Sequence, residues 1–157
     1  MYFKEIEIRW NDLDANRHLA NTAYSEFATH TRIEFLNGIG FDQKFMAKNQ
    51  IGPVMFYEHV YYFKEVFTGK IKVSLGLKGL SAKGKFFEFH HDFYNSQGRN
   101  IARLEVMGGW MNLKERKLMD LPPEIMAKFD DVPKDEDFRV LSNADTRRFA
   151  KTPKDLT

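Results

Sequence analysis

Six polar side chains lie close together near the start of the chain, and their types suit general acid–base chemistry. They are Asp12, Asp14, Asn16, His18, Asn21 and Tyr24. A carboxylate can accept a proton, and an imidazole can orient water or carry a proton near neutral pH. A loop held between two regular elements fixes such groups without burying their polar atoms. We therefore interpret residues 12–24 as a candidate catalytic loop.

The segments on either side of this loop predict the elements that hold it. Residues 3–10 alternate with a period of two, because Ile6 and Ile8 share one face of the expected strand. Residues 22–36 carry apolar side chains over much of a helix surface, which is typical of a helix covered by a sheet. Gly38 and Gly40 then end the helix.

Four further strands are expected after Pro53. Each is rich in aromatic and β-branched residues or alternates apolar with polar residues, and turn signals containing Gly69, Gly84 and Gly98 separate them. The four segments are residues 54–66, 71–77, 87–94 and 101–113. A strand, a long helix and four strands in this order predict an α+β fold in which an antiparallel sheet curls around the helix.

The expected domain ends near residue 132. A short helix is predicted to begin at Leu121-Pro-Pro, because proline is favoured in the first helical turn. Residues 133–157 have mixed charge and few apolar side chains. We therefore expect a single domain over residues 1–132 and a loosely packed tail over residues 133–157.

Composition narrows the classes of function. The chain has 157 residues with 15 Phe, 6 Tyr, 2 Trp and no Cys, and its net charge is only +2. We expect no nucleic-acid partner, because the Lys and Arg residues are scattered along the sequence and do not form a basic patch. The lack of cysteine excludes disulfides and thiolate nucleophiles and suits the cytoplasm. No segment approaches the roughly 18 apolar residues that suggest a membrane span.

The remaining histidines do not form a metal site. His90 and His91 are neighbours in an expected strand, so their side chains point to opposite faces. No metal and no cofactor is predicted.

The motif DLDANRHLANTAY at residues 12–24 resembles the signature D-x-D-x-x-G-H-V-N-N-x-x-Y of the 4-hydroxybenzoyl-CoA thioesterase-like family. Its D-L-D-x-N-x-H part looks closest to the acyl-ACP thioesterase branch. The resemblance implies the hotdog fold, a long central helix wrapped by an antiparallel sheet of about five strands. It also implies an acyl thioesterase that acts on acyl-CoA or acyl-ACP. Pockets of this family form between subunits, so a homodimer or homotetramer is expected.

The resemblance also assigns roles to residues. Asp14 matches the second Asp of the motif, which implies the acid or base. Asn16 and His18 match an Asn-x-His that orients water or the carboxylate, and Glu65 in YYFKEVFTG matches a second catalytic carboxylate. Asn21 and Tyr24 are the expected substrate-binding residues.

Several simpler interpretations stay open. We interpret Asp12 mainly as a structural carboxylate that stabilises the loop or caps a helix. We interpret Arg32 as one partner of a structural ion pair. Glu65 can equally be a surface residue of an edge strand. Arg17 stands where most members have Gly, and Ala20 replaces the first Asn of the usual pair. The alternatives to a thioesterase are a non-catalytic acyl-thioester binding protein and a hotdog dehydratase or hydratase.

Overall fold

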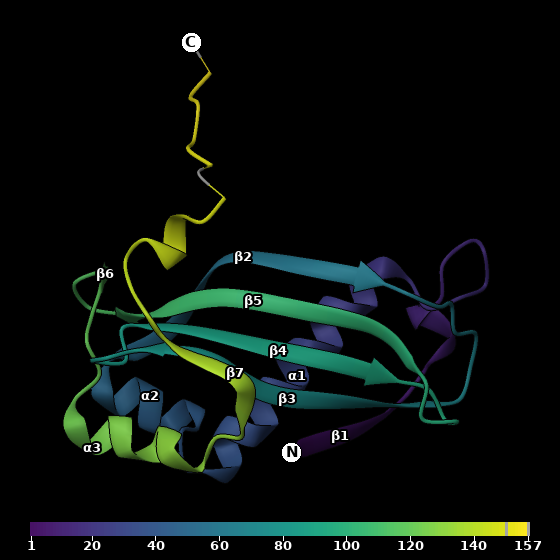
Figure 1. Ribbon diagram of the computed structural model, residues 1–157, viewed down its shortest axis with the longest axis horizontal. Coiled ribbons are helices and arrows are strands. Elements are labelled where there is room, and N and C mark those ends of the chain that lie inside the picture. Colours follow the sequence, from purple (N-terminus) through teal and green to yellow (C-terminus); the bar gives the residue numbers. More distant parts are fainter. Residues whose placement is uncertain (150, 157) are drawn as a thin grey trace.

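Two layers make up the protein, a curled sheet and the helices that cover one of its faces (Figure 1). The computed structural model describes residues 1–149 and 151–156. Within them the strands are β1 (Tyr2–Glu7), β2 (Ile51–Tyr62), β3 (Lys70–Ser81), β4 (Phe86–Tyr94), β5 (Asn100–Asn112), β6 (Lys117–Leu118) and β7 (Lys134–Leu141). The α-helices are α1 (Asn21–Gly38), α2 (Gln43–Asn49) and α3 (Pro123–Met126), and short 3-10 turns span Trp10–Asp12, Ala127–Asp131 and Asp145–Arg147.

The main sheet is antiparallel throughout, with the strand order β1-β3-β4-β5-β2. This arrangement matches a hotdog fold and confirms the predicted antiparallel sheet. The two additional strands lie off this path, with β6 beside β5 and β7 parallel to β3. β2 ends at Tyr62, earlier than the sequence predicts, so Glu65 lies on the connection to β3 and not in a strand.

Helix α1 buries one stripe against the sheet. The buried residues of the helix are Ala23, Tyr24, Phe27, Ala28, Thr31, Arg32 and Leu36. The opposite side is open in the single chain, where Ile33 is 49% exposed. The sequence prediction of this helix is confirmed to within two residues at its ends. A sheet that covers one side of the helix explains why the apolar pattern is broad but not continuous.

Polar side chains also anchor α1 to β4. Arg32 donates from Nη1 to Nε2 of His91 at 3.0 Å, and His91 Nδ1 donates to the carbonyl of Ser74 at 2.7 Å. Burial and the nearby guanidinium hold the pKa of His91 well below its ordinary value, so its ring is neutral. Burial also lowers the pKa of Arg32 to about 10, although Glu58 lies 3.8 Å away and opposes the shift. Arg32 is therefore structural, as the sequence suggests.

Aromatic rings fill the core at the other end of the sheet. Phe41 and Phe87 stack on Trp110 at centroid distances of 4.7 and 5.3 Å, and Phe129 packs edge-on at 5.9 Å. Each of these rings is almost fully buried. The high aromatic content of the chain therefore supplies core volume, with the large buried area that aromatic side chains bring.

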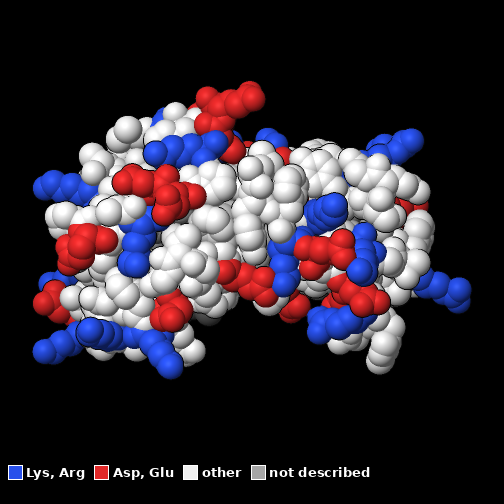
Figure 2. Space-filling view, turned by 90° about the horizontal axis from the view of Figure 1, so that it is seen from below, with Lys and Arg blue, Asp and Glu red and all other residues white. Residues whose placement is uncertain are grey.

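Charges of both signs are mixed on one face of the molecule. On the face that Figure 2 shows, Lys and Arg lie among Asp and Glu, and neither sign forms a continuous field. No helix among the described residues combines the length and apolarity that crossing a membrane requires.

The sequence predicts a loosely packed tail from residue 133, and this is wrong for its first part. β7 pairs with β3, with Leu77 opposite Lys134 and Leu80 opposite Val140. Leu141 is only 4% exposed. From β7 the chain continues across the sheet face opposite α1, where the ring of Phe149 lies 4.9 Å from that of Tyr57 on β2. We call residues 134–149 the strap.

Buried charges hold the strap in place. Arg139 donates to Glu88 at 2.9 Å and also contacts Asp145, while Glu88 is only 1% exposed. The imidazole of His90 lies between the carboxylates of Asp92 and Asp135. Phe138 and Leu141 also pack on the core, but two apolar residues three positions apart form no alternating pattern, so apolar periodicity does not detect this strand.

We predict that truncation after Val132 lowers the melting temperature by at least about 8 °C, since about 2–4 °C corresponds to 1 kcal/mol in a domain of this size. The truncation removes the partners of Glu88 and His90 and uncovers one side of β3. Truncation after Phe149 is the matched control, and it should change the melting temperature by less than about 2 °C. Equal melting temperatures for the two proteins would show that the strap adds no stability and that the domain ends at residue 132.

Candidate functional site

The candidate catalytic loop is a small hairpin that places Asp14 and His18 side by side. Leu13 and Leu19 form an antiparallel bridge, and the N–H of Asp14 donates to the carbonyl of His18 at 2.9 Å. The N–H of Arg17 closes the turn by donating to the carbonyl of Asp14 at 2.9 Å. Arg17 adopts a φ of 65°, so the turn keeps the left-handed conformation that glycine favours and accepts an arginine there.

Asp12 holds the base of this hairpin. Its carboxylate, 4% exposed, accepts hydrogen bonds from the backbone N–H of Arg9 at 2.7 Å and from the Arg9 guanidinium at 2.8 Å. Hydrogen bonds from Arg9 hold the pKa of Asp12 below its ordinary value against the effect of burial. Its carbonyl accepts the N–H of Ala20, the residue before α1. Asp12 is therefore a structural carboxylate.

His18 lies between two carboxylates. Its Nδ1 is 3.2 Å from Oδ2 of Asp14, and its Nε2 is 3.9 Å from Oε2 of Glu65. The approach of Glu65 depends on one backbone hydrogen bond, from the N–H of Leu19 to the carbonyl of Val66 at 2.7 Å. That bond ties the loop to the connection between β2 and β3. Two segments more than forty residues apart in the sequence thus supply one acid–base group.

Asn16 does not join this group through its side chain. It lies at the exposed tip of the hairpin, where its backbone N–H donates to Oδ1 of Asp14 at 2.8 Å. The carboxylate of Asp14 is thus held on one oxygen and faces His18 with the other. Asn16 contacts the carboxylate, but with an atom that any residue except proline carries.

A pocket of about 350 Å³ opens beside these residues. It is lined by Asp14, His18, Leu19, Asn21, Tyr24, Tyr62, Phe63, Lys64 and Glu65. Five of the six predicted catalytic and substrate-binding residues therefore share one pocket, and Asn16 is the exception. Tyr24 forms an inner wall, with its ring edge-on to Tyr62 at 5.2 Å, and burial raises its pKa to about 12. It is a neutral wall residue at physiological pH.

The start of α1 offers hydrogen-bond donors to this pocket. The residue before the helix, Ala20, has no side chain that caps it. The N–H of Ala20 is taken by Asp12 and that of Ala23 by Ala20, which leaves the N–H groups of Asn21 and Thr22 without a partner among the described residues. Free amides at a helix N-terminus can stabilise a developing oxyanion.

Four residues of the pocket wall are not predicted from the sequence, namely Leu19, Tyr62, Phe63 and Lys64. Tyr62 contacts Asn21, because its hydroxyl donates to the Asn21 carbonyl at 3.4 Å, and Phe63 is 57% exposed beside it. The segment YYFKEVFTG contains Tyr62, Phe63 and Lys64 directly before Glu65, so the sequence does carry a signal for this wall. Exposed aromatic residues just before a candidate carboxylate are the feature that identifies this wall.

Metal ligation has no candidate in the structure. Among residues 1–149 and 151–156, no group of three or more His, Asp or Glu side chains is placed to hold an ion.

Solved structures with this fold include several thioesterases. The chain is 19% identical to the DHNA-CoA thioesterase of Staphylococcus aureus, with a TM-score of 0.74 over 82% of this chain and 87% of that one. It is 14% identical to a 1,4-dihydroxy-2-naphthoyl-CoA thioesterase from Synechocystis, with a TM-score of 0.73 over 83% and 96% of the two chains. A Staphylococcus aureus protein solved in complex with CoA has 17% identity and a TM-score of 0.75, over 82% and 80%.

At these identities the likeness shows the fold. A search of curated proteins found no significant match. The model of the thioesterase-like superfamily matches residues 8–129, which include the whole candidate pocket. The chain therefore belongs to the thioesterase-like superfamily, with the hotdog fold of the 4-hydroxybenzoyl-CoA thioesterase-like proteins.

Proposed function

We propose that this protein hydrolyses an acyl-CoA thioester, with the Asp14 carboxylate as general base. The observation that carries the proposal is the Asp14–His18–Glu65 group beside the uncapped start of α1. Membership of the superfamily supports the reaction class, and the structural neighbours named as CoA thioesterases favour CoA as the carrier. Acyl-ACP is the alternative carrier.

In the proposed mechanism Asp14 takes a proton from water as the water attacks the thioester carbonyl. His18 donates from Nδ1 to Oδ2 of Asp14 and fixes the orientation of the carboxylate, while Asn16 holds the other oxygen through its backbone N–H. The N–H groups of Asn21 and Thr22 stabilise the tetrahedral oxyanion. When the carbon–sulfur bond breaks, the thiolate takes the proton from Asp14 and leaves as free thiol.

The acyl group would lie against Tyr24 and Tyr62, and Asn21 would contribute its backbone to the carbonyl end. Lys64 on the pocket rim carries a positive charge toward an anionic carrier. The cytoplasm is the proposed location, because a chain without cysteine suits a reducing compartment.

The test is release of free thiol from a panel of acyl-CoA and acyl-ACP substrates. We predict that Asp14→Asn lowers turnover by about 10²–10⁴, the usual range for a general base, with little change in melting temperature. Asp12→Asn is the matched control, because it alters a carboxylate of the same loop that holds structure. It keeps the backbone carbonyl that binds Ala20 and one side-chain oxygen for Arg9, so it should lower the melting temperature and leave turnover of the folded protein within about tenfold.

His18 and Glu65 separate the possible roles. His18→Asn keeps an N–H donor near the position of Nδ1 and removes Nε2, so a loss below about tenfold supports an orienting histidine. A loss equal to that of Asp14→Asn would make His18 the base instead. Glu65→Gln should act like Asp14→Asn only if the two carboxylates act as a unit.

A wild-type protein that releases no thiol from any substrate would favour one of two other functions. If it hydrolyses no thioester on either carrier but binds acyl-CoA, the chain is a non-catalytic acyl-thioester binding protein. If a crotonyl-type absorbance disappears instead, the reaction is hydration.

We further propose that the protein is a homodimer joined along β2. This strand is one of the two edges of the main sheet and is 12 residues long, with exposed Tyr61 and Tyr62 at the end beside the pocket. A long apolar edge strand promotes association. In the single chain the side chain of Asp14 is 31% exposed and that of Glu65 is 62% exposed, so a second subunit at this edge would complete the pocket.

We predict a dimer by light scattering at micromolar concentration. Tyr61→Lys should weaken it at least tenfold, because it places a charge on the exposed apolar edge that the two subunits would share. Val140→Lys is the control: it adds the same charge at a residue that is 66% exposed on β7, away from this edge. A monomeric wild type, or equal effects of the two substitutions, would contradict a dimer joined along β2.

A further inference from the structure

A second, larger concavity lies on the other face of the sheet, and we call it the outer groove. It has a volume of about 1110 Å³ and shares no lining residue with the candidate pocket. Its apolar floor consists of Met55, Phe56, Phe86 and Leu118. Phe86 precedes Phe87 in β4, and because alternate residues of a strand face opposite sides, Phe86 points away from the core under α1.

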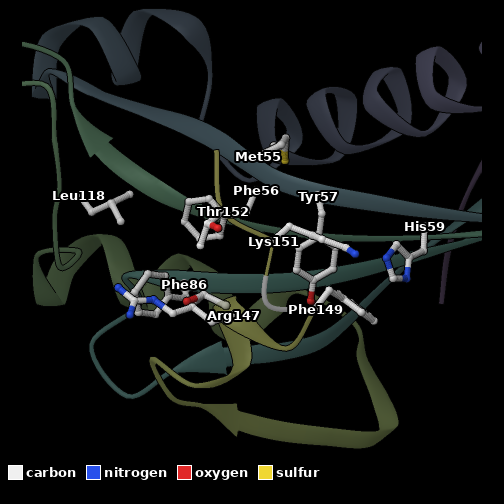
Figure 3. Close-up of a pocket in the computed structure, with 11 residues that line it drawn as sticks. Met55, Phe56, Tyr57, His59, Phe86, Leu118, Arg147, Phe149, Lys151 and Thr152 are labelled. Carbon is white, nitrogen blue, oxygen red and sulfur yellow. The ribbon is translucent and has the colours of Figure 1, made fainter. Parts of the chain in front are cut away.

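The end of the strap and the residues after it border the groove. The ring of Phe149 packs against Tyr57 at 4.9 Å and His59 at 4.2 Å, and this contact brings the chain back over β2. Figure 3 shows Arg147, Lys151 and Thr152 from this segment around the aromatic floor from β2 and β4. The groove therefore has an apolar floor from the sheet and a polar rim from the C-terminal segment.

Two cations on this rim lack partners. Neither Arg147 nor Lys151 lies within ion-pair distance of a carboxylate among the described residues. Their neighbours Arg139 and Arg148 are both paired with Glu88 and Asp145. The rim therefore carries a net positive charge next to an apolar surface.

The lining also contains an unsatisfied hydroxyl. The Tyr57 hydroxyl oxygen is buried and has no hydrogen-bond partner in the described structure. Because that oxygen is buried, Tyr57 contributes the apolar part of its ring to the wall of the groove.

From these observations we propose that the outer groove binds a fatty-acid anion. The alkyl chain would lie over Phe56, Phe86 and Leu118, and the carboxylate would pair with Arg147 and Lys151. A guanidinium and a carboxylate make charge-assisted hydrogen bonds of matching geometry. Ligand pockets usually measure roughly 300–1,000 Å³, so the volume is sufficient for a long single chain. This binding does not depend on the proposed thioesterase activity.

Calorimetric titration of the full chain with octanoate, decanoate and 1-decanol tests the proposal. We expect decanoate to bind, with an affinity about two- to fourfold higher per methylene added from octanoate. The alcohol should bind at least tenfold more weakly than decanoate, because it lacks the charge. Equal affinity for the acid and the alcohol, or no dependence on chain length, would overturn the assignment.

Variants locate the site. R147Q/K151Q should weaken decanoate binding about tenfold or more, and L118E should do the same by placing a negative charge on the floor. K44Q/K48Q is the matched control, since it removes two exposed cations of α2 and changes the net charge equally. It should alter the affinity less than twofold.

Two further outcomes count against the proposal. If Asp14→Asn or Tyr24→Phe changes decanoate affinity while R147Q/K151Q does not, the fatty acid occupies the candidate pocket. If L118E changes the oligomeric state and leaves decanoate binding unchanged, the groove is a contact between copies of the chain. Melting temperatures of all variants within about 2 °C of wild type ensure that these results report on binding and not on folding.

Discussion

The closure of the loop at Asp12 is the constraint on which the candidate site depends. One residue joins both ends of the hairpin: its carboxylate binds Arg9 at the entry, and its carbonyl binds Ala20 at the exit. That closure fixes where α1 begins and therefore where its free amides point. It also fixes the antiparallel pairing that sets Asp14 opposite His18. A buried, fully hydrogen-bonded carboxylate is stable in this role, because its charge is neutralised by a guanidinium.

The parts of the site that the sequence predicts are local. Asp14 and His18 are four residues apart on one turn, so the motif alone brings them together. Glu65 is different, because its position depends on where β2 ends and on the bond between Leu19 and Val66. Neither is encoded in a short pattern. The motif predicts a catalytic role for Asn16, but in the structure its side chain lies outside the pocket and only its backbone N–H contacts Asp14.

The fold was predictable where apolar side chains alternate, and unpredictable where buried charges replace them. The strands of the main sheet and α1 follow their periodic patterns. The residues Glu88, His90 and Asp92 alternate with phenylalanine and histidine on β4 and so suggest a solvent face, yet all three are buried. The strap pairs Glu88 with Arg139 and His90 with Asp135, and Arg103 of β5 pairs with Asp92. The charged residues that pair on such a strand lie some fifty residues apart in the sequence, so a search for apolar periodicity does not find them.

The two faces of the sheet therefore differ in how completely a single chain covers them. The strap covers part of the sheet face opposite α1 and is held there by ion pairs to β4. The candidate pocket, in contrast, stays open to solvent at the β2 edge. A carboxylate base gains strength when water is excluded from it, and Asp14 in the single chain is still in contact with solvent. The same residues that wall the pocket, Tyr62 and Phe63, also belong to the exposed apolar edge. In the proposed dimer, association at that edge would also complete the pocket, so the strength of the dimer would set how far the Asp14 carboxylate is desolvated.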